Sequence, residues 1–400
     1  MQDNITKKPN RITTRMVLIL VFVLALGILN PIYGTIGIGL IICICMTIMS
    51  NRPIRVPAAF SLLWLLLFGI SYVLFGSFTA SYIEYYLVAV LLSFFAGYFC
   101  GSMINGDMVR TTKTIIYVII FAEAFHALLN SIVNSGTVRW QLVDVFRGLR
   151  SATGSAFINT FVFSLAFVFI FIEKRKVLKI LGISAVVVSL YYSFILGTRT
   201  TYLVAAVVVF VDILLYFHEQ LNFKKYSRLI IELVFIILVS CILYNRDTFS
   251  IRTMMEQSNL FVRFTEVGLD KSDQLRIDSI SIGLQSLLEH PFGGQIERRY
   301  FHNMWLDAGR VGGIFPFIFL LFYSINNISN VFYLFRQKQI DIEYRYIILS
   351  INLGLLLNCF TEPVLEGIME SFLVFIFING IVESDYIQYK HQAYNIKKVT

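Results

Sequence analysis

The sequence predicts an all-α membrane protein, a polytopic helix bundle of about 12 transmembrane helices with one large external loop that contains an amphipathic helix. Its 400 residues are 57% hydrophobic and only 14% charged, whereas a soluble domain carries about 25% charged residues. Long apolar runs recur along the chain, and basic residues alternate between the loops that join them. The net charge of +8 therefore calls for no nucleic acid partner, because membrane proteins collect lysine and arginine on their cytoplasmic side.

The apolar runs have the length of about 20 residues that a helix needs to cross about 30 Å of hydrocarbon. The predicted spans are 16–30, 33–50, 57–76, 84–104, 114–133, 156–172, 178–197, 201–217, 228–245, 311–334, 345–360 and 364–383. The predicted organisation is nine helices in residues 1–245, an external loop at 246–310, three helices in 311–384 and a cytoplasmic tail at 385–400.

The distribution of basic residues predicts the orientation. An even number of crossings puts both termini on one side of the membrane. Of the 33 lysines and arginines, 21 lie on that side, and every loop there has at least two. By the positive-inside rule, both termini are expected to be cytoplasmic in a multi-pass cell-membrane protein. All five cysteines lie in or at the end of apolar runs, which predicts small buried side chains without a disulfide framework.

Arginines on the external side oppose this rule, and they cluster. Arg199 lies in FILGTRTTYL, in a turn of two or three residues between two spans, where charge at the membrane face is costly and usually functional. A guanidinium grips phosphate or carboxylate with two donors, so the cluster predicts an anionic ligand such as a lipid-linked pyrophosphate. The alternative is arginines that are solvated or that snorkel to head groups. The other candidates are Arg147 and Arg150 before the sixth helix, Arg276, and Arg298, Arg299 and Arg310 around His302.

His302 lies in RRYFHNMWLDAGRVGG, just before an apolar helix. A neutral imidazole near pH 7 can take a proton from an attacking hydroxyl, which makes His302 the candidate catalytic base and Asn303 a candidate substrate ligand. The alternative is a histidine that is hydrogen-bonded in an interfacial loop.

Charged residues also occur inside predicted spans. Glu123 and His126 are three residues apart, on one helix face, and either pair with each other or point into a cavity. On the last span, Glu366 and Glu370 follow Glu362 and are candidates for positioning acceptor hydroxyls or balancing Arg199.

The segment LRIDSISIGLQSLL, residues 275–288, has apolar residues at helical spacing and predicts the amphipathic helix of the external loop. Ile277, Ile280, Ile282 or Leu284, and Leu287 or Leu288 are expected to line one face that lies over the bundle. His290-Pro291 is expected to end the helix, and Gly293-Gly294 to form a turn.

Three motifs resemble the O-antigen polymerase and O-antigen ligase superfamily of bacterial membrane glycosyltransferases. They are RGLRSATGSAFINTF at 147–161, ILGTRTTYLVA at 195–205, and the stretch from LRIDSISIGL to the apolar helix at 275–321. The third motif has an arginine that opens a helix, a His-Pro-Phe-Gly-Gly turn and a His-Asn dipeptide before a glycine-containing helix. In the first motif, Ser155-Ala156 stands where the family often has Asn-Pro.

The resemblance implies that an oligosaccharide is transferred from an undecaprenyl-pyrophosphate carrier to a sugar hydroxyl outside the cytoplasmic membrane, with inversion and without metal or cofactor. Arg150, Arg199 and Arg276 would hold the diphosphate, and His302 would serve as general base. Its partners would be the carrier-linked oligosaccharide and the bilayer, with a chain-length regulator protein as a further candidate. Polymerisation of repeat units into O-antigen, capsule or exopolysaccharide is the preferred function. The alternatives are an O-antigen ligase and, from another class, a flippase for the same lipid-linked sugar.

Overall fold

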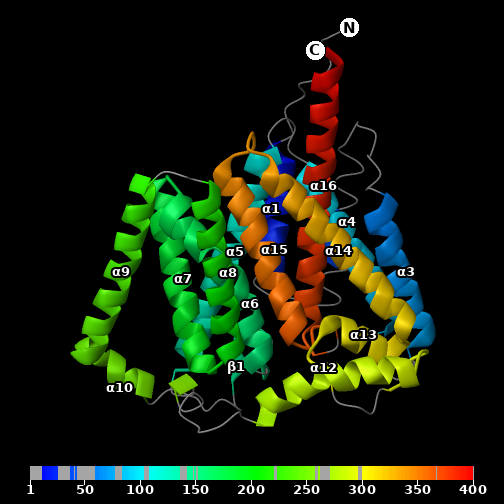
Figure 1. Ribbon diagram of the computed structural model, residues 1–400, viewed down its shortest axis with the longest axis horizontal. Helices are drawn as coiled ribbons and strands as arrows, with labels where there is room; N and C mark the ends of the chain where they lie inside the picture. Colours follow the sequence, from blue (N-terminus) through cyan, green and yellow to red (C-terminus); the bar gives the residue numbers. More distant parts are fainter. Residues whose placement is uncertain are drawn as a thin grey trace. The chain divides into compact units, whose positions relative to one another are not determined.

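The computed structural model describes most of the chain as helix. The described residues are 11–25, 37–39, 41–42, 59–76, 83–102, 108–135, 142–146, 148–149, 152–219, 223–256, 260–261, 271–295, 300–365 and 367–399. The chain divides into two compact units, unit 1 with residues 1–122 and 271–400, and unit 2 with residues 123–270. The helical class predicted from the sequence is confirmed (Figure 1).

Several helices are long and apolar enough to cross a membrane, as a multi-pass protein requires. Among the described residues there are 6 of them, at 109–133, 152–172, 176–196, 199–219, 314–336 and 342–361, and shorter apolar helices cover 60–75 and 87–101. The count of twelve spans stays a prediction, and most of the predicted second span, 33–50, falls outside the described residues.

Unit 1 contains a close pair of helices that are far apart in sequence. Its elements are α1 (Arg11–Ala25), α3 (Ala59–Phe75), α4 (Ile83–Ser102), the first part of α5 (Met108–Val133), α12 (Lys271–Glu289), α13 (Met304–Gly312), α14 (Ile314–Arg336), α15 (Ile342–Thr361) and α16 (Met369–Val399). α4 and α16 approach closely because a Cβ at Gly97 would overlap the carbonyl of Phe377, and one at Gly380 the carbonyl of Phe94.

Unit 2 is a second helical group with a short hairpin at one end. It holds the rest of α5, β1 (Val143–Asp144), β2 (Gly148–Leu149), α6 (Ala152–Ser164), the π-helix η2 (Val168–Ile172), α7 (Lys176–Leu196), α8 (Arg199–Glu219), α9 (Phe223–Asn245), the 3-10 helix η3 (Thr248–Ser250) and α10 (Ile251–Glu256). The strands are antiparallel, with Val143 opposite Leu149 and Asp144 opposite Gly148. The sequence had predicted no strand here.

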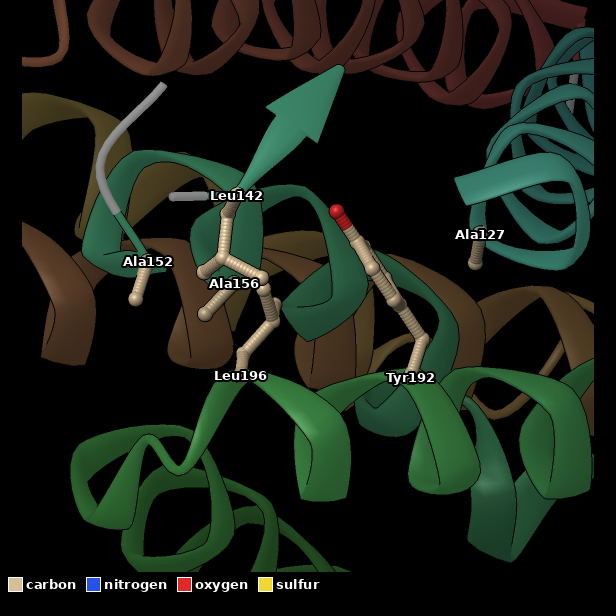
Figure 2. Packing of buried hydrophobic residues seen from close by; sticks show 6 residues of the cluster. All are labelled: Ala127, Leu142, Ala152, Ala156, Tyr192 and Leu196. Carbon is tan, nitrogen blue, oxygen red and sulfur yellow. The ribbon is translucent and has the colours of Figure 1, made fainter. Parts of the chain in front are cut away.

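A hydrophobic cluster packs that end of unit 2. Its buried residues come from α5, the chain before β1, α6 and α7: Ala127, Leu142, Ala152, Ala156, Tyr192 and Leu196. Figure 2 shows Leu142, Ala156 and Leu196 converging, with the Tyr192 ring between them and Ala127. The cluster therefore packs the end of α7, the start of α6 and the chain before the hairpin against the C-terminal turns of α5.

Two helix boundaries differ from the sequence prediction. The apolar run expected as one helix from 311 is divided at Gly313, whose φ of 82 and ψ of −161 only glycine adopts readily, so that α13 precedes α14. The last helix begins at Met369 rather than 364 and continues to Val399, through the segment expected as a tail. Pro363 and Gly367 lie in the non-helical link before it.

The amphipathic helix exists, because α12 covers the predicted 275–288. Among the predicted face residues whose side chains are described, Leu287 is buried and the others are not. The buried positions are Ser279, Gly283, Ser286 and Leu287, whereas Ile280, Ile282, Leu284 and Leu288 are exposed. The side chain of Ile277 is outside the described residues.

Candidate functional site

His302 has a strained backbone and a carboxylate neighbour. Its φ is 52, in the left-handed region that non-glycine residues rarely occupy. Its side chain is 35% exposed, and Nδ1 lies 3.7 Å from Oε2 of Glu362, a carboxylate with only 4% of its side chain exposed. Glu362 follows the last turn of α15 and donates its backbone N–H to the carbonyl of Asn358. An imidazole that reaches solvent is thus backed by a buried acid.

This arrangement suits acid–base chemistry. The carboxylate faces Nδ1, which favours the tautomer with its proton on Nδ1 and leaves Nε2 to accept a proton from a hydroxyl. The carboxylate would also stabilise the positive charge that forms on the ring. The 3.7 Å separation is longer than a hydrogen bond, and such contacts often tighten only when substrate is bound.

Both neighbours of His302 are anchored, which explains how the strain persists. Asn303 caps α13, since its Oδ1 accepts from the Leu306 N–H at 3.1 Å and its Nδ2 donates to the Phe360 carbonyl at 3.4 Å. The Phe301 N–H donates to the Asp307 carboxylate at 2.7 Å, and the Ser279 hydroxyl to the Phe301 carbonyl at 2.9 Å. Asn303 therefore has a capping role beside its predicted role in substrate binding.

Arg310 lies inside unit 1, where its described contacts are with protein groups. Its Nε is 3.8 Å from Oδ1 of Asp307, and both side chains are 1% exposed. Its Nη1 donates to the Gln295 carbonyl at 3.1 Å, and its guanidinium lies 5.6 Å from the centre of the Tyr300 ring. Arg310 therefore ties the turn after α12 to α13, and its binding to substrate stays a prediction.

Arg199 occupies the tight turn that the sequence predicted. α7 ends at Leu196, Gly197 has a φ of 63, and Arg199 is the first residue of α8. Arg199 is half-buried, and the buried hydroxyls of Thr198 and Thr201 lie 3.3 Å apart beside it. The first N–H groups of a helix carry partial positive charge, so this turn adds to the attraction of a guanidinium for anions.

The remaining predicted residues cannot be placed in the same detail. Arg147, Arg150, Arg298, Arg299 and Glu366 lie outside the described residues, and Arg276 is in α12 with its side chain likewise outside them; Glu370 is in the first turn of α16. Unit 1 brings together His302, Asn303 and Arg310 around α13, and Arg199 belongs to unit 2.

Unit 2 holds a second histidine site, at His126, and this one is buried. The predicted pair has Nδ1 of His126 3.9 Å from Oε2 of Glu123. The structure adds two residues at Nε2, with Oδ2 of Asp144 at 3.0 Å and Nδ2 of Asn130 at 2.9 Å. The side chains of His126 and Asp144 are 3% and 0% exposed. Asp144 was missed in the sequence, because this residue reaches His126 only after the chain leaves α5 and turns back beside it. The one signal in the sequence is a single acidic residue within the apolar run LVDVF.

The asparagines beside this histidine fix the hairpin. Val145 N–H donates to Oδ1 of Asn130 at 2.8 Å, and Asn134 exchanges two side-chain hydrogen bonds of 2.8 Å with the backbone of Val143. In the sequence, Arg147 lies between β1 and β2, and Arg150 directly follows β2. Unit 2 therefore places β1 and the turn with Arg199 around one hydrophobic cluster (Figure 2).

No protein-family model matches the chain, and no curated protein matches it. Within the described ranges, no group of three or more His, Cys, Asp or Glu side chains could hold a metal ion. The resemblance to the polymerase and ligase superfamily, and the metal-independent reaction that it implies, stay predictions.

Proposed function

We propose that this chain is a membrane glycosyltransferase that polymerises undecaprenyl-pyrophosphate-linked oligosaccharide repeat units at the outer face of the cytoplasmic membrane. The observation that carries the proposal is His302 against Glu362, a partly exposed imidazole backed by a buried carboxylate. His302 precedes the short helix α13 and then α14, and Glu362 directly follows α15; α14 and α15 are both long and apolar enough to cross a membrane. A base at that position suits a reaction whose acceptor is a hydroxyl and whose donor is held in the bilayer.

In the proposed reaction, Nε2 of His302 accepts the proton of the acceptor sugar's hydroxyl as its oxygen attacks the anomeric carbon. The bond from that carbon to the carrier's pyrophosphate breaks, and the carrier leaves as an anion. Guanidinium groups would stabilise the leaving charge, the role assigned to Arg199, Arg150 and Arg276, with Arg147 and Arg299 as further substrate ligands. Glu362 keeps the ring oriented and balances the imidazolium.

The first experiment measures polysaccharide length and lipid-linked intermediates in cells that lack this gene. Single repeat units on the outer leaflet, with no long chains, are the expected result. Long chains that remain on carrier lipid would show a ligase instead. Repeat units confined to the cytoplasmic leaflet would show a flippase, and either result overturns the proposal.

A pair of variants then tests His302 itself. His302→Gln should lower the polymerisation rate by roughly 100- to 10,000-fold, the range typical of general acid–base catalysis, while the protein still inserts and binds donor. His290→Gln is the matched control, because His290 directly follows α12 and is placed in no catalytic role. Normal polymer from His302→Gln would remove this residue from the chemistry.

A further inference from the structure

α12 runs across the ends of its neighbours in unit 1. In Figure 1 it crosses beneath α13 and the lower ends of α14 and α16, rather than lying alongside them. α14 is a candidate membrane span. A helix that lies across the end of a spanning helix runs along the membrane surface.

One side of α12 packs on the protein through small residues. Ser279 and Ser286 are 7% and 3% exposed, and a Cβ at Gly283 would lie 3.0 Å from Cδ1 of Leu306. Leu287, 6% exposed, is the apolar exception and packs in a cluster with Phe301 and Leu306. The side of the helix that faces the protein therefore contains few of its large apolar residues.

The other two sides of α12 differ in character. Residues four apart lie above one another on a helix, since each advances by about 100°. Ile280, Leu284 and Leu288 form one such row and are 39%, 50% and 80% exposed. Ser281, Gln285 and Glu289 form the next row, about 100° further round the helix, also exposed, with Gln285 donating to Glu289 at 2.8 Å. Ile282, 46% exposed, is the one apolar residue beside the polar row.

A helix at the edge of a water-soluble protein has one apolar face, and it packs that face inward. α12 instead has three sectors, with protein on one, apolar side chains on the second and polar side chains on the third. This division matches a helix at a membrane surface, where protein, hydrocarbon and water meet.

The apolar flank continues toward the surface of a membrane-crossing helix. Phe292, 65% exposed, follows α12, and its ring centre lies 6.2 Å from that of Phe75 at the end of α3. Phe75 lies 5.6 Å from Phe315 at the start of α14, and these two are 39% and 41% exposed. Aromatic rings gather where a membrane meets water. Exposed aromatic rings thus connect the turn after α12 to the end of α3 and the start of α14.

We infer that α12 is an interfacial helix, with the flank of Ile280, Leu284 and Leu288 immersed in the bilayer at the boundary between head groups and acyl chains. The flank of Ser281, Gln285 and Glu289 faces water. This inference is independent of the reaction proposed above. It also fixes the depth of His302, because Ser279 of α12 holds the Phe301 carbonyl just before it.

The test places an environment-sensitive fluorescent amino acid, by stop-codon suppression, at one position at a time in the full chain. The positions are Leu284 and Leu288 on the apolar flank, with Ser281 and Gln285 as controls on the same helix. All four are exposed, so the probe need not disturb the core. The protein is reconstituted into vesicles of phosphatidylcholine and phosphatidylglycerol that carry bromine near the head-group end of the acyl chains.

Probes at 284 and 288 should emit at shorter wavelength and lose fluorescence with brominated lipid but not with aqueous iodide. Probes at 281 and 285 should respond to iodide instead. Iodide quenching at all four positions would place the helix in water, and protection of 284 and 288 from both quenchers would mean that protein covers the flank. Either outcome overturns the inference.

Discussion

The backbone conformation of His302 costs stability that glycine at this position would not cost. A left-handed residue other than glycine is unfavourable by on the order of 1–2 kcal/mol, and His302 has a φ of 52. Asn303 and Asp307 hold this conformation through the cap and the Phe301 N–H. Residues strained in this way concentrate at functional positions, which fits an imidazole whose direction matters more than its contribution to folding.

Replacement by glycine should therefore separate stability from activity. His302→Gly is expected to raise the free energy of unfolding by about 1 kcal/mol, since glycine adopts this φ without strain, and to abolish polymer formation. Thermal unfolding in detergent and polysaccharide gels measure the two effects. In His290→Gly, where no positive φ is relieved, stability should fall. A loss of stability in His302→Gly equal to that in His290→Gly would contradict the role of strain.

A buried carboxyl beyond the predicted span 364–383 should make stability depend on pH. Burial raises the pKa of Asp385 to about 7, partly offset by hydrogen bonds from Tyr344 and Thr112, against about 3.9 when unfolded. Between about pH 3.9 and about pH 7 the folded state binds one more proton than the unfolded state. The free energy of unfolding is therefore highest below this window and falls by about 1.4 kcal/mol per pH unit across it.

Asp385→Asn should remove that dependence when unfolding is followed from pH 4 to 8. Asp247→Asn is the matched control, because hydrogen bonds from Thr253 lower the pKa of Asp247, so that its contribution is lost as pH falls instead. A wild-type slope in Asp385→Asn would assign the titration to another group.

At the scale of elements, Gly313 sets the end of α13, the short helix that precedes α14. Its φ is 82, and a Cβ there would overlap the Pro291 carbonyl oxygen, which accepts the Ile314 N–H at 2.8 Å. The turn after α12 is thereby joined to the link between α13 and α14. The short helix α13, with His302 just before it, is held by this joint and does not simply continue α14.

Gly313→Ala should be far more destabilising than Gly294→Ala. Both glycines have a φ of 82, but a Cβ at Gly294 meets nothing within 4 Å, so it adds only the strain of about 1–2 kcal/mol. Gly313→Ala adds a backbone clash and should reduce the yield of folded protein in detergent, measured by size-exclusion chromatography. Equal yields from the two variants would show that the joint bends freely.

The elements show what the sequence could and could not predict. Apolar length was a sufficient signal for the helices, and the turn at Arg199 was found because only Gly197 and Thr198 separate two apolar runs. The buried face of α12 was predicted wrongly, because helical spacing reveals an apolar stripe but not whether protein or lipid covers it. The contacts of His126 with Asp144, and of His302 with Glu362, join segments that lie apart in the sequence. No motif of fixed spacing in the sequence therefore predicts either contact.

At the scale of the whole molecule, the orientation in the membrane remains a prediction from charge. A reporter that is active only in the cytoplasm should be active when fused at residue 1 or at residue 400, and inactive when inserted at residue 265 in the predicted external loop. The reason is the excess of lysine and arginine on the side of the termini. Activity at 265 and at 400 together would require an even number of crossings between them, which contradicts the predicted three.

The short link between α7 and α8 has a consequence for biosynthesis. Only Gly197 and Thr198 lie between two helices of 21 residues each, so we expect the two helices to enter the bilayer together as one hairpin. In the predicted orientation the tip of that hairpin, with Arg199, has to traverse the hydrocarbon. An arginine at the centre of a membrane helix costs roughly 2.5–3.5 kcal/mol, so in the predicted orientation the apolar flanks on both sides of this turn would have to offset that cost during insertion.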